Sequence, residues 1–320
     1  MILLNLGGGL SNLVALGFLA CLARLSSMGS GSGAVAVPEA GLPSTILRHI
    51  SAAGITLSAA APQDIPGDFE VVGYSVEGRE IRAYRFGRGP HPVGLIGGIH
   101  GGYERNTILL AYEIIHYFSA HPQLVPDPLS VYIVPSANPD GLYRLTAGDA
   151  RMSLADVSSE TAPGRFNANG VDLNRNWDCD WSPFAVWRDL PISAGSRPFS
   201  EVESQVLRDF LLGKKMQAVV FWHSALPGVF PGDCGETLPL ARTLVREYAR
   251  ASGYPAKDEF SSYPVTGDAA DWLALVGIPA FEVELSDHRS TEFDKNLAGV
   301  LAVLNRLGYL NSNPWSNTLR

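Results

Sequence analysis

The amino-acid sequence predicts an α/β layer fold. From Asp68 onward, short apolar runs alternate with amphipathic segments, the pattern expected when helices pack on a sheet. The chain has 320 residues, of which 46% are hydrophobic, so it can bury a sizeable core. Several of the apolar runs end in or beside a histidine or a glutamate, which places polar side chains along one edge of the predicted sheet.

Each element is predicted from the spacing of its apolar residues. Continuous apolar runs indicate buried strands, whereas apolar residues three and four positions apart indicate helices. Ser200 and Glu203 match a capping box at the start of one helix. The predicted strands are 92–100, 129–138, 216–224 and 278–285, and the predicted helices are 104–118, 201–212, 238–251 and 290–307.

The ends of the chain differ from its body. Residues 1–45 are predicted to be a leader and linker before one folded domain at 46–312, with a short tail at 313–320. The apolar leader is similar to the core of a secretory signal, but its first basic residue is only Arg24. Translation beginning at Met28 would explain the same features, and we expect export slightly more than retention in the cytoplasm.

Two cysteines also bear on whether the protein is exported. Cys179 and Cys234 each follow a segment near the predicted site described below. They can form a disulfide if both loops border one cleft, which suits an oxidising compartment, or they can remain two unlinked thiols.

The charge distribution excludes nucleic acid as a partner. The formal net charge is −8, and the sequence contains no run of lysine and arginine. The folded domain has no apolar run of about eighteen residues, so we expect no membrane span within it. We expect the protein to act as a monomer.

Three polar residues mark the predicted functional edge. His100, His223 and Glu284 stand at or next to the ends of apolar strands, where ligands bind in open α/β sheets. Together with Glu104, the histidines can form a His₂Glu zinc site with its fourth position open to water. The sequence has no HExxH helix, so the helical metalloprotease arrangement is excluded. Taken singly, a histidine at a strand end can instead be an ordinary polar residue.

Six short segments share an order along the chain: HGGYE, NPDG, GRFNANGVDLNRNW, FWHS, SYPVTGDAADW and FEVEL. In this order they resemble the zinc carboxypeptidases, the M14 metallopeptidases, over roughly residues 68–308. VDLNRNW is the most specific segment, and HGGYE is similar to bacterial members of the family. The resemblance implies a three-layer α/β/α sandwich around a central twisted sheet of about eight strands, mixed but mostly parallel.

The resemblance also implies one Zn²⁺ ion per chain and assigns catalytic roles. His100, Glu104 and His223 match the zinc ligands, and Glu284 matches the catalytic glutamate. As general base, Glu284 would take a proton from the zinc-activated water and pass it to the leaving amine. Arg165 matches an arginine that polarises the scissile carbonyl and stabilises the charge that develops on it.

Further matches concern the substrate. Asn174 and Arg175 match the pair that binds the terminal carboxylate, and Tyr263 matches a mobile tyrosine that closes over the substrate. The implied partner is therefore a peptide with a free C-terminal carboxylate. The implied enzyme is a metallocarboxypeptidase, a zinc-dependent hydrolase that cuts the last amide bond of a peptide.

The spacing of two ligands departs from the family pattern. Members of the family most often place histidine and glutamate three positions apart, whereas Glu104 follows His100 by four. The additional residue falls in the pair Gly101–Gly102, where the backbone accepts unusual dihedral angles. We expect a local bulge that still brings Glu104 to the metal. Alternatively, Glu104 only caps the following helix at its positive end.

Substrate preference depends on Asp268. This residue, with Ala269 and Ala270, falls in the segment that lines the family's specificity pocket. A buried carboxylate in a roomy pocket favours a cationic end group, such as lysine, arginine or the diaminopimelate of cell-wall peptides. Alternatively, Asp268 is the N-cap of the next helix, a position that aspartate favours.

Glu282 and Glu284 lie on the same face of a predicted strand, because side chains alternate with period two. Glu284 is nearer the strand end and matches the family's catalytic position. Glu282 lies deeper, where a carboxylate needs a partner, and is expected to be a structural or supporting residue.

Two other functions remain as alternatives. One is an N-acyl-amino-acid amidohydrolase on the same scaffold, similar to the desuccinylases and aspartoacylases. Tyr263 and the segment DLNRN favour the peptidase over this activity. The other is a catalytically silent protein that binds zinc or peptide. The presence of Glu284, Arg165 and all three metal ligands argues against it.

Overall fold

The structure, a computed structural model, describes residues 67–146 and 162–313. The predicted leader and linker, and nearly all of the predicted tail, lie outside the described residues. Within the described part, none of the helices combines the length and the apolar character needed to cross a bilayer.

A mixed sheet of seven strands forms the centre of the fold, in the order β1-β2-β4-β3-β7-β9-β8. The four neighbouring strands β4, β3, β7 and β9 are parallel, and the outer pairs β1–β2, β2–β4 and β9–β8 are antiparallel. The predicted mixed sheet is confirmed, with one strand fewer than expected. The strands are β1 (Phe69–Tyr74), β2 (Glu80–Phe86), β3 (His91–Ile96), β4 (Leu129–Val134), β7 (Ala218–Ser224), β8 (Gly228–Pro231) and β9 (Ala280–Leu285).

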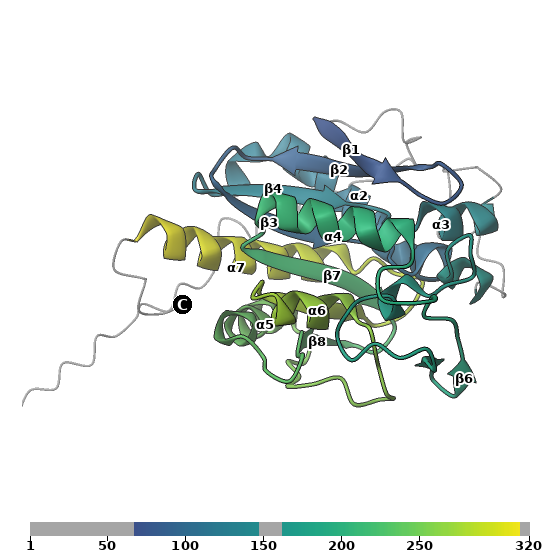
Figure 1. The fold of residues 1–320 in the computed structure, drawn as a ribbon. Helices are drawn as coiled ribbons and strands as arrows, with labels where there is room; N and C mark the ends of the chain where they lie inside the picture. The colour runs from purple at the N-terminus through teal and green to yellow at the C-terminus, as the bar shows by residue number, and fades with distance from the viewer. Residues whose placement is uncertain (1–66, 147–161, 314–320) are drawn as a thin grey trace, which may run out of the picture. The chain divides into compact units, whose positions relative to one another are not determined.

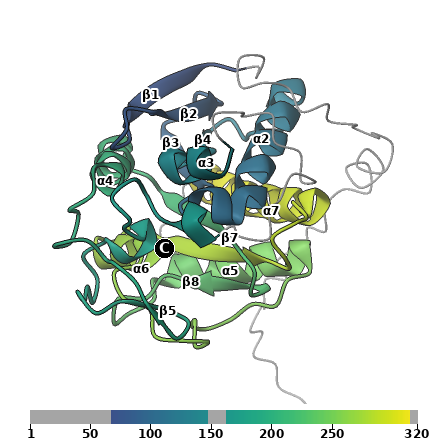
Figure 2. The same ribbon diagram turned by 90° about the vertical axis from the view of Figure 1, so that its right-hand side faces the viewer.

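Helices cover both faces of this sheet, which confirms the predicted three layers. Figure 2 shows α4 and α6 on one side and α2 and α7 on the other. Helix α5 packs against α7, and in Figure 1 α4 crosses in front of the strands. The helices are α2 (Arg105–Ala120), α3 (Pro139–Thr146), α4 (Val202–Lys214), α5 (Pro239–Ser252), α6 (Ala269–Leu275) and α7 (Phe293–Ser312).

The central strands are apolar along their whole length because both of their faces are covered. Every residue of β4 and of β7 is buried. On the α4 and α6 side, the rings of Trp177, Phe199 and Trp272 pack with centroids 5.1–5.4 Å apart. Trp177 of this aromatic cluster belongs to the segment that carries Asn174 and Arg175, so core packing fixes the position of that segment.

The predicted capping box is wrong. Helix α4 begins after Glu201, and the Ser200 hydroxyl donates to the Glu201 carboxylate. Glu203 instead accepts hydrogen bonds from the Val76 backbone N–H and from the Asn167 amide. These partners lie far away in the sequence, so local spacing gave no sign that they would compete with the cap.

Candidate active site

The parallel strands bring the predicted residues to one edge of the sheet. His223 and Glu284 are paired neighbours near the ends of β7 and β9. Strand β3 ends at Ile96, earlier than predicted, and a short glycine-containing connection carries the chain on to His100. These residues reach a common edge because the strands β3, β7 and β9 are neighbours in the sheet.

The local bulge expected between His100 and Glu104 is a 3₁₀ turn, Gly101–Glu104. Gly101 has a φ of +47°, a conformation that residues with a Cβ atom rarely adopt. Glu104 stands at the N-cap position of α2, but its side chain makes no capping hydrogen bond. The alternative role of Glu104 as a helix cap is therefore wrong, and the glycine turn directs its carboxylate towards the two histidines.

His100, Glu104 and His223 form a buried cluster with ligand atoms within 4.8 Å of one another. Glu104 Oε2 lies 3.3 Å from His223 Nδ1, and Glu104 Oε1 lies 4.0 Å from His100 Nε2. Glu104 Oε2 is also buried and forms no hydrogen bond. Two imidazoles and a carboxylate are ligands that Zn²⁺ prefers, so the cluster fits this ion.

Each histidine of the cluster has a second carboxylate behind it. Asp172 Oδ1 lies 3.4 Å from His100 Nδ1, and Glu282 Oε1 lies 3.2 Å from His223 Nε2. Both imidazoles thus face the cluster with one ring nitrogen and a supporting acid with the other. Such pairs fix the ring orientation of metal-binding histidines.

Arg165 is a buried cation beside the cluster. Its Nε donates to Asp172 Oδ2 at 2.7 Å, and its Nη1 lies 3.7 Å from Glu104 Oε1. The Nη2 atom is buried and has no hydrogen-bond partner. The guanidinium also lies over the Trp187 ring, 4.8 Å from its centroid. A fixed cation with an unused donor can bind a carbonyl oxygen, as the sequence predicts for Arg165.

Asn174 and Arg175 occupy different environments. The Asn174 amide donates to Asp268 Oδ2 at 2.7 Å and to Glu282 Oε1 at 3.2 Å, and its oxygen accepts the Ala269 N–H. Arg175 is held by backbone oxygens, through Nη1 to Asn174 and Nε to Val186, and lines the cavity. Arg175 thus keeps donors for a ligand, whereas the Asn174 amide is already engaged.

Glu284 lies beside the cluster, and its pKa is higher than that of an ordinary glutamate. Burial, with a further contribution from the negative Glu104, raises the pKa of Glu284 to about 8, and the nearby His223 opposes this shift. The Leu226 backbone N–H donates to its Oε2 atom. A positive charge placed in the cluster lowers this pKa again, so Glu284 can exchange a proton near neutral pH.

Comparisons with known proteins agree with this geometry. The profile of the family described as zinc carboxypeptidase, Peptidase M14, matches residues 64–296. The chain belongs to this family. Carboxypeptidase B from Astacus astacus is 36% identical over 243 residues, which span 68% of this chain and 78% of that protein. The zinc cofactor and the metallocarboxypeptidase class predicted from the sequence are thereby confirmed.

Two solved structures have the same fold. Carboxypeptidase A from Helicoverpa armigera has a TM-score of 0.57 at 20% identity, over 77% of this chain and 68% of that chain. Murein-tripeptide amidase MpaA from Escherichia coli O157 has a TM-score of 0.55 at 20% identity, over 78% of this chain and 94% of that chain.

In this zinc carboxypeptidase, a cavity of about 270 Å³ adjoins the metal cluster and reaches Arg165, Arg175 and Glu284. Tyr263 also lines it, packed edge-on against Phe260. Burial raises the pKa of Tyr263, whereas the two arginines lower it. The cavity therefore contains all the predicted catalytic and substrate-binding side chains together with His100 and His223, while the roles assigned to them remain predictions.

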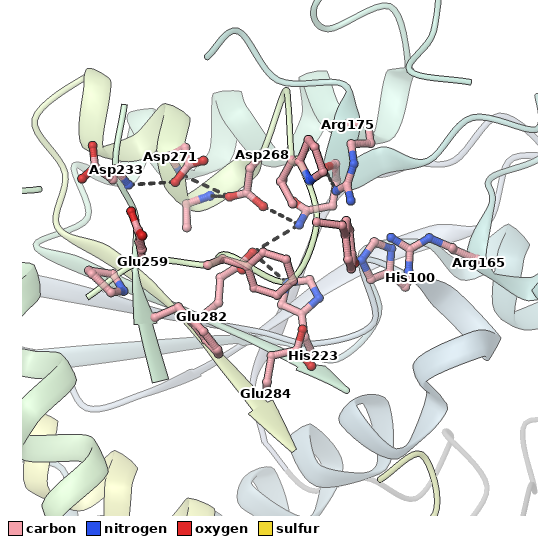
Figure 3. A pocket seen from close by; sticks show the side chains of 18 residues that line it. His100, Arg165, Arg175, His223, Asp233, Glu259, Asp268, Asp271, Glu282 and Glu284 are labelled. Atoms are coloured by element: carbon pink, nitrogen blue, oxygen red, sulfur yellow. Dashed lines mark hydrogen bonds and ion pairs between the residues drawn. The ribbon is translucent and has the colours of Figure 1, made fainter. Parts of the chain in front are cut away.

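One side of the cavity is strongly acidic (Figure 3). We call Asp233, Asp268, Asp271 and Glu282 the acidic floor. Asp268 is the N-cap of α6, accepting the Ala270 and Asp271 N–H groups, which confirms that role, and it also lines the cavity, while its part in substrate preference stays a prediction. Glu259 is a further acid on the cavity wall.

Burial and neighbouring acids raise the pKa values of Asp268 and Asp271, whereas the neighbouring His223 lowers the pKa of Glu282 to about 2 against the effect of burial. Burial, followed by the charges of Glu282 and Asp271, holds the pKa of Asp268 well above its usual range. Burial and the charge of Glu282 raise the pKa of Asp271 to about 7, against the hydrogen bond that it accepts from the Asp233 N–H. Among the described residues, Glu282 is thus paired with His223, whereas Asp233, Asp268 and Asp271 form no ion pair with a cation.

A disulfide joins Cys179 and Cys234, as the sequence allows. Cys234 follows Asp233 of the acidic floor, and the Cys179 backbone oxygen accepts the N–H of Gly267, next to Asp268. The bond therefore ties the loop of Asp233 to the Cys179 loop, which in turn contacts the loop before Asp268.

Sequence analysis missed several members of this site. Asp172 lies inside the segment VDLNRNW, and its place three residues before Arg175 was the available signal. Asp233 and Asp271 approach each other across 38 positions through the hydrogen bond Asp233 N–H to Asp271 Oδ1. Only the order of the strands and loops brings these two acids together.

Proposed function

We propose that the enzyme removes single residues from the C-terminal ends of peptides, with Glu284 as general base. One observation carries the proposal: Arg175, the proposed partner of the terminal carboxylate, lines the same cavity as the residues of the catalytic centre, namely His100, His223, Glu284 and Arg165. A peptide whose carboxylate pairs with Arg175 places its last amide bond inside the cavity. Only a chain end fits there, which selects exopeptidase action.

A zinc ion held by His100, Glu104 and His223 would supply Lewis acidity that activates water and polarises the substrate carbonyl. Glu284 accepts the proton of the attacking water and returns it to the departing amine nitrogen. Arg165 Nη2 donates to the carbonyl oxygen as negative charge develops there, in a site from which bulk water is excluded. Arg165 is already fixed by Asp172, so it needs little reorganisation.

The carboxylate contact belongs to Arg175 in this proposal, with Asn174 as its neighbour on the floor side. Asn174 holds Asp268 and Glu282 in place through its amide nitrogen. Tyr263 closes the opposite side of the cavity over bound substrate, where its hydroxyl can approach the scissile amide. These roles follow the family pattern and are supported by the residues that line the cavity.

The acidic floor supports a preference for a cationic terminal residue: lysine, arginine or diaminopimelate. An ammonium or guanidinium group matches carboxylates that otherwise repel one another. A test compares peptides that end in Lys, diaminopimelate and Phe and differ only in that residue. We expect the two cationic ends to give the higher kcat/KM. A clear preference for Phe contradicts this part of the proposal.

A zinc titration of metal-free protein tests the reaction itself. We expect hydrolysis to reach its maximum at one Zn²⁺ per chain, with release of the terminal amino acid from a peptide acid. The matched peptide amide, which lacks the carboxylate, should be inert. Equal cleavage of acid and amide, or rapid cleavage of an N-acyl amino acid with inert peptides, contradicts the carboxypeptidase proposal.

A further inference from the structure

We propose that Glu282 is a positioning residue for the zinc ligand His223 and that it links the metal site to the acidic floor. This inference rests on the proposed function, because it assigns a further residue of the same site. Glu282 lies two residues before Glu284 on β9, and its side chain points to the same face of the sheet.

The orientation of His223 carries the inference. Its Nδ1 atom faces Glu104 Oε2 at 3.3 Å, and its Nε2 atom faces Glu282 Oε1 at 3.2 Å. The second contact has the distance of an ion pair, and Nε2 forms no hydrogen bond. The imidazole is buried and lies between the two acids, so rotating the ring would remove both contacts at once.

A ligand imidazole must present a lone pair to the metal. The negative charge of Glu282, 3.2 Å from Nε2, favours a proton on that atom, which leaves the lone pair of His223 on Nδ1, the atom that faces the cluster. A carboxylate at Nε2 also strengthens Nδ1 as a donor to the metal. Glu282 therefore acts on the metal through His223 without touching it.

Glu282 is itself held in place. Its strand neighbour on β7 is Phe221, within a fully buried strand. The Asn174 amide donates to Glu282 Oε1 and to Asp268 Oδ2, and Asp268 caps α6. This chain of contacts runs from the start of α6 to a metal ligand (Figure 3).

Asp172 offers a comparison on the other histidine. It faces His100 Nδ1 but is also paired with Arg165 and accepts the Asn174 N–H, so its removal would disturb several groups. Among the described residues, the ion-pair partner of Glu282 is His223. Its hydrogen bond from the Asn174 amide can be kept by a glutamine oxygen, so Glu282→Gln removes the charge behind His223 with less disturbance than a change at Asp172.

The experiment measures zinc affinity by competition with a fluorescent chelator, without substrate. Glu282→Gln keeps the size of the side chain and removes its charge. We expect about 10-fold to 100-fold weaker zinc binding, the range typical for loss of such a supporting acid. The matched control is Asp271→Asn, which removes a charge from the same floor without contacting His223 and should leave zinc affinity within about twofold of wild type.

A zinc affinity of Glu282→Gln close to wild type overturns the proposal, as does an equal loss in Asp271→Asn. If Glu282→Gln does not fold, nitrogen NMR of histidine-labelled, zinc-loaded wild type decides. We expect His223 to carry its proton on Nε2 and the metal on Nδ1, and the reverse assignment overturns the proposal. Because neither measurement uses a substrate, a failure of the proposed peptidase reaction is detected separately.

Discussion

Buried carboxylates lie on both sides of the cavity, in opposite electrostatic surroundings. On the metal side, Asp172 is next to Arg165 and His100, which bring the pKa of its carboxyl well below the usual range although burial alone would raise it. On the acidic floor, burial raises the pKa of Asp268, and Glu282 and Asp271 raise it further. The two aspartates are equally inaccessible to solvent, so their neighbours decide the direction of the shift.

The difference shows what each side still needs. The metal side has its own cations, and one Glu104 oxygen forms no hydrogen bond among the three ligands, so a single Zn²⁺ ion completes it. The floor is held mainly by neutral groups, namely the Asn174 amide and backbone N–H groups. We infer that the substrate's own cation completes the floor. Each change considered next alters either the metal side or the acidic floor, and the unaltered side serves as the control.

The largest effect is expected on the metal side. Glu284→Gln removes the general base, and we expect kcat to fall by roughly 10²-fold to 10⁴-fold, the usual contribution of such a group. Zinc content, measured by mass spectrometry, should stay at one ion per chain. Turnover close to wild type would show that another residue moves the proton.

Arg175→Gln is expected to have the next largest effect. Losing one partner of a buried charge pair costs about 2–5 kcal/mol, so kcat/KM for a peptide acid should fall at least roughly 30-fold. The ratio of Lys to Phe substrates should change little, because the floor is intact. A specificity change as large as the loss of rate would mean that Arg175 contributes to the floor as well.

Loss of the disulfide should affect the floor rather than the metal. Replacing Cys179 and Cys234 together by serine should lower the free energy of unfolding by about 2–4 kcal/mol, measured by urea denaturation. The preference for Lys should also decrease, since the loops of Asp233 and Gly267 lose their tie. Unchanged zinc affinity in the same variant is the internal control. A loss of zinc would contradict the separation of the two sides.

The smallest predicted effect is a pH dependence. Asp271, with a pKa of about 7, is neutral below this pH and negative above it. Binding of a cationic end group should therefore strengthen as pH rises from about 6 to 8, by roughly threefold to tenfold, for one partly screened charge pair. The measured quantity is the ratio of kcat/KM for Lys and norleucine peptides, in which titrations common to both cancel. Asp271→Asn should reduce this pH dependence, and an unchanged dependence would contradict the role of Asp271.

The metal side could be predicted from the sequence to a large extent. His100, His223 and Glu284 mark the ends of apolar strands, and the short motifs lie within a few residues of them. The α/β layer class followed from alternating apolar patterns, and the resemblance to the zinc carboxypeptidases implied the three layers. The turn at Gly101 was expected because glycine accepts a positive φ, and the structure has it.

The acidic floor could not be assembled in this way. Asp233 follows β8 and Asp271 lies in α6, and they meet because β8 pairs antiparallel with β9 at the edge of the sheet. No local sequence pattern indicates that β8 pairs with β9. The capping box failed for a related reason, since Glu203 is engaged by Val76 and Asn167 from distant segments. Apolar periodicity predicts elements, whereas polar contacts between distant loops depend on the finished fold.

The most direct test of the account compares two peptides that differ only in a terminal Lys or norleucine. Norleucine has the same four-carbon chain as lysine but lacks the ammonium group, so the ratio of kcat/KM isolates the charge. For the zinc-loaded enzyme at pH 8, we expect the Lys peptide to be favoured by about 10-fold to 100-fold, the value of a charge-assisted contact. Equal rates, or a preference for norleucine, would contradict the claim that the acidic floor is completed by the substrate's cation.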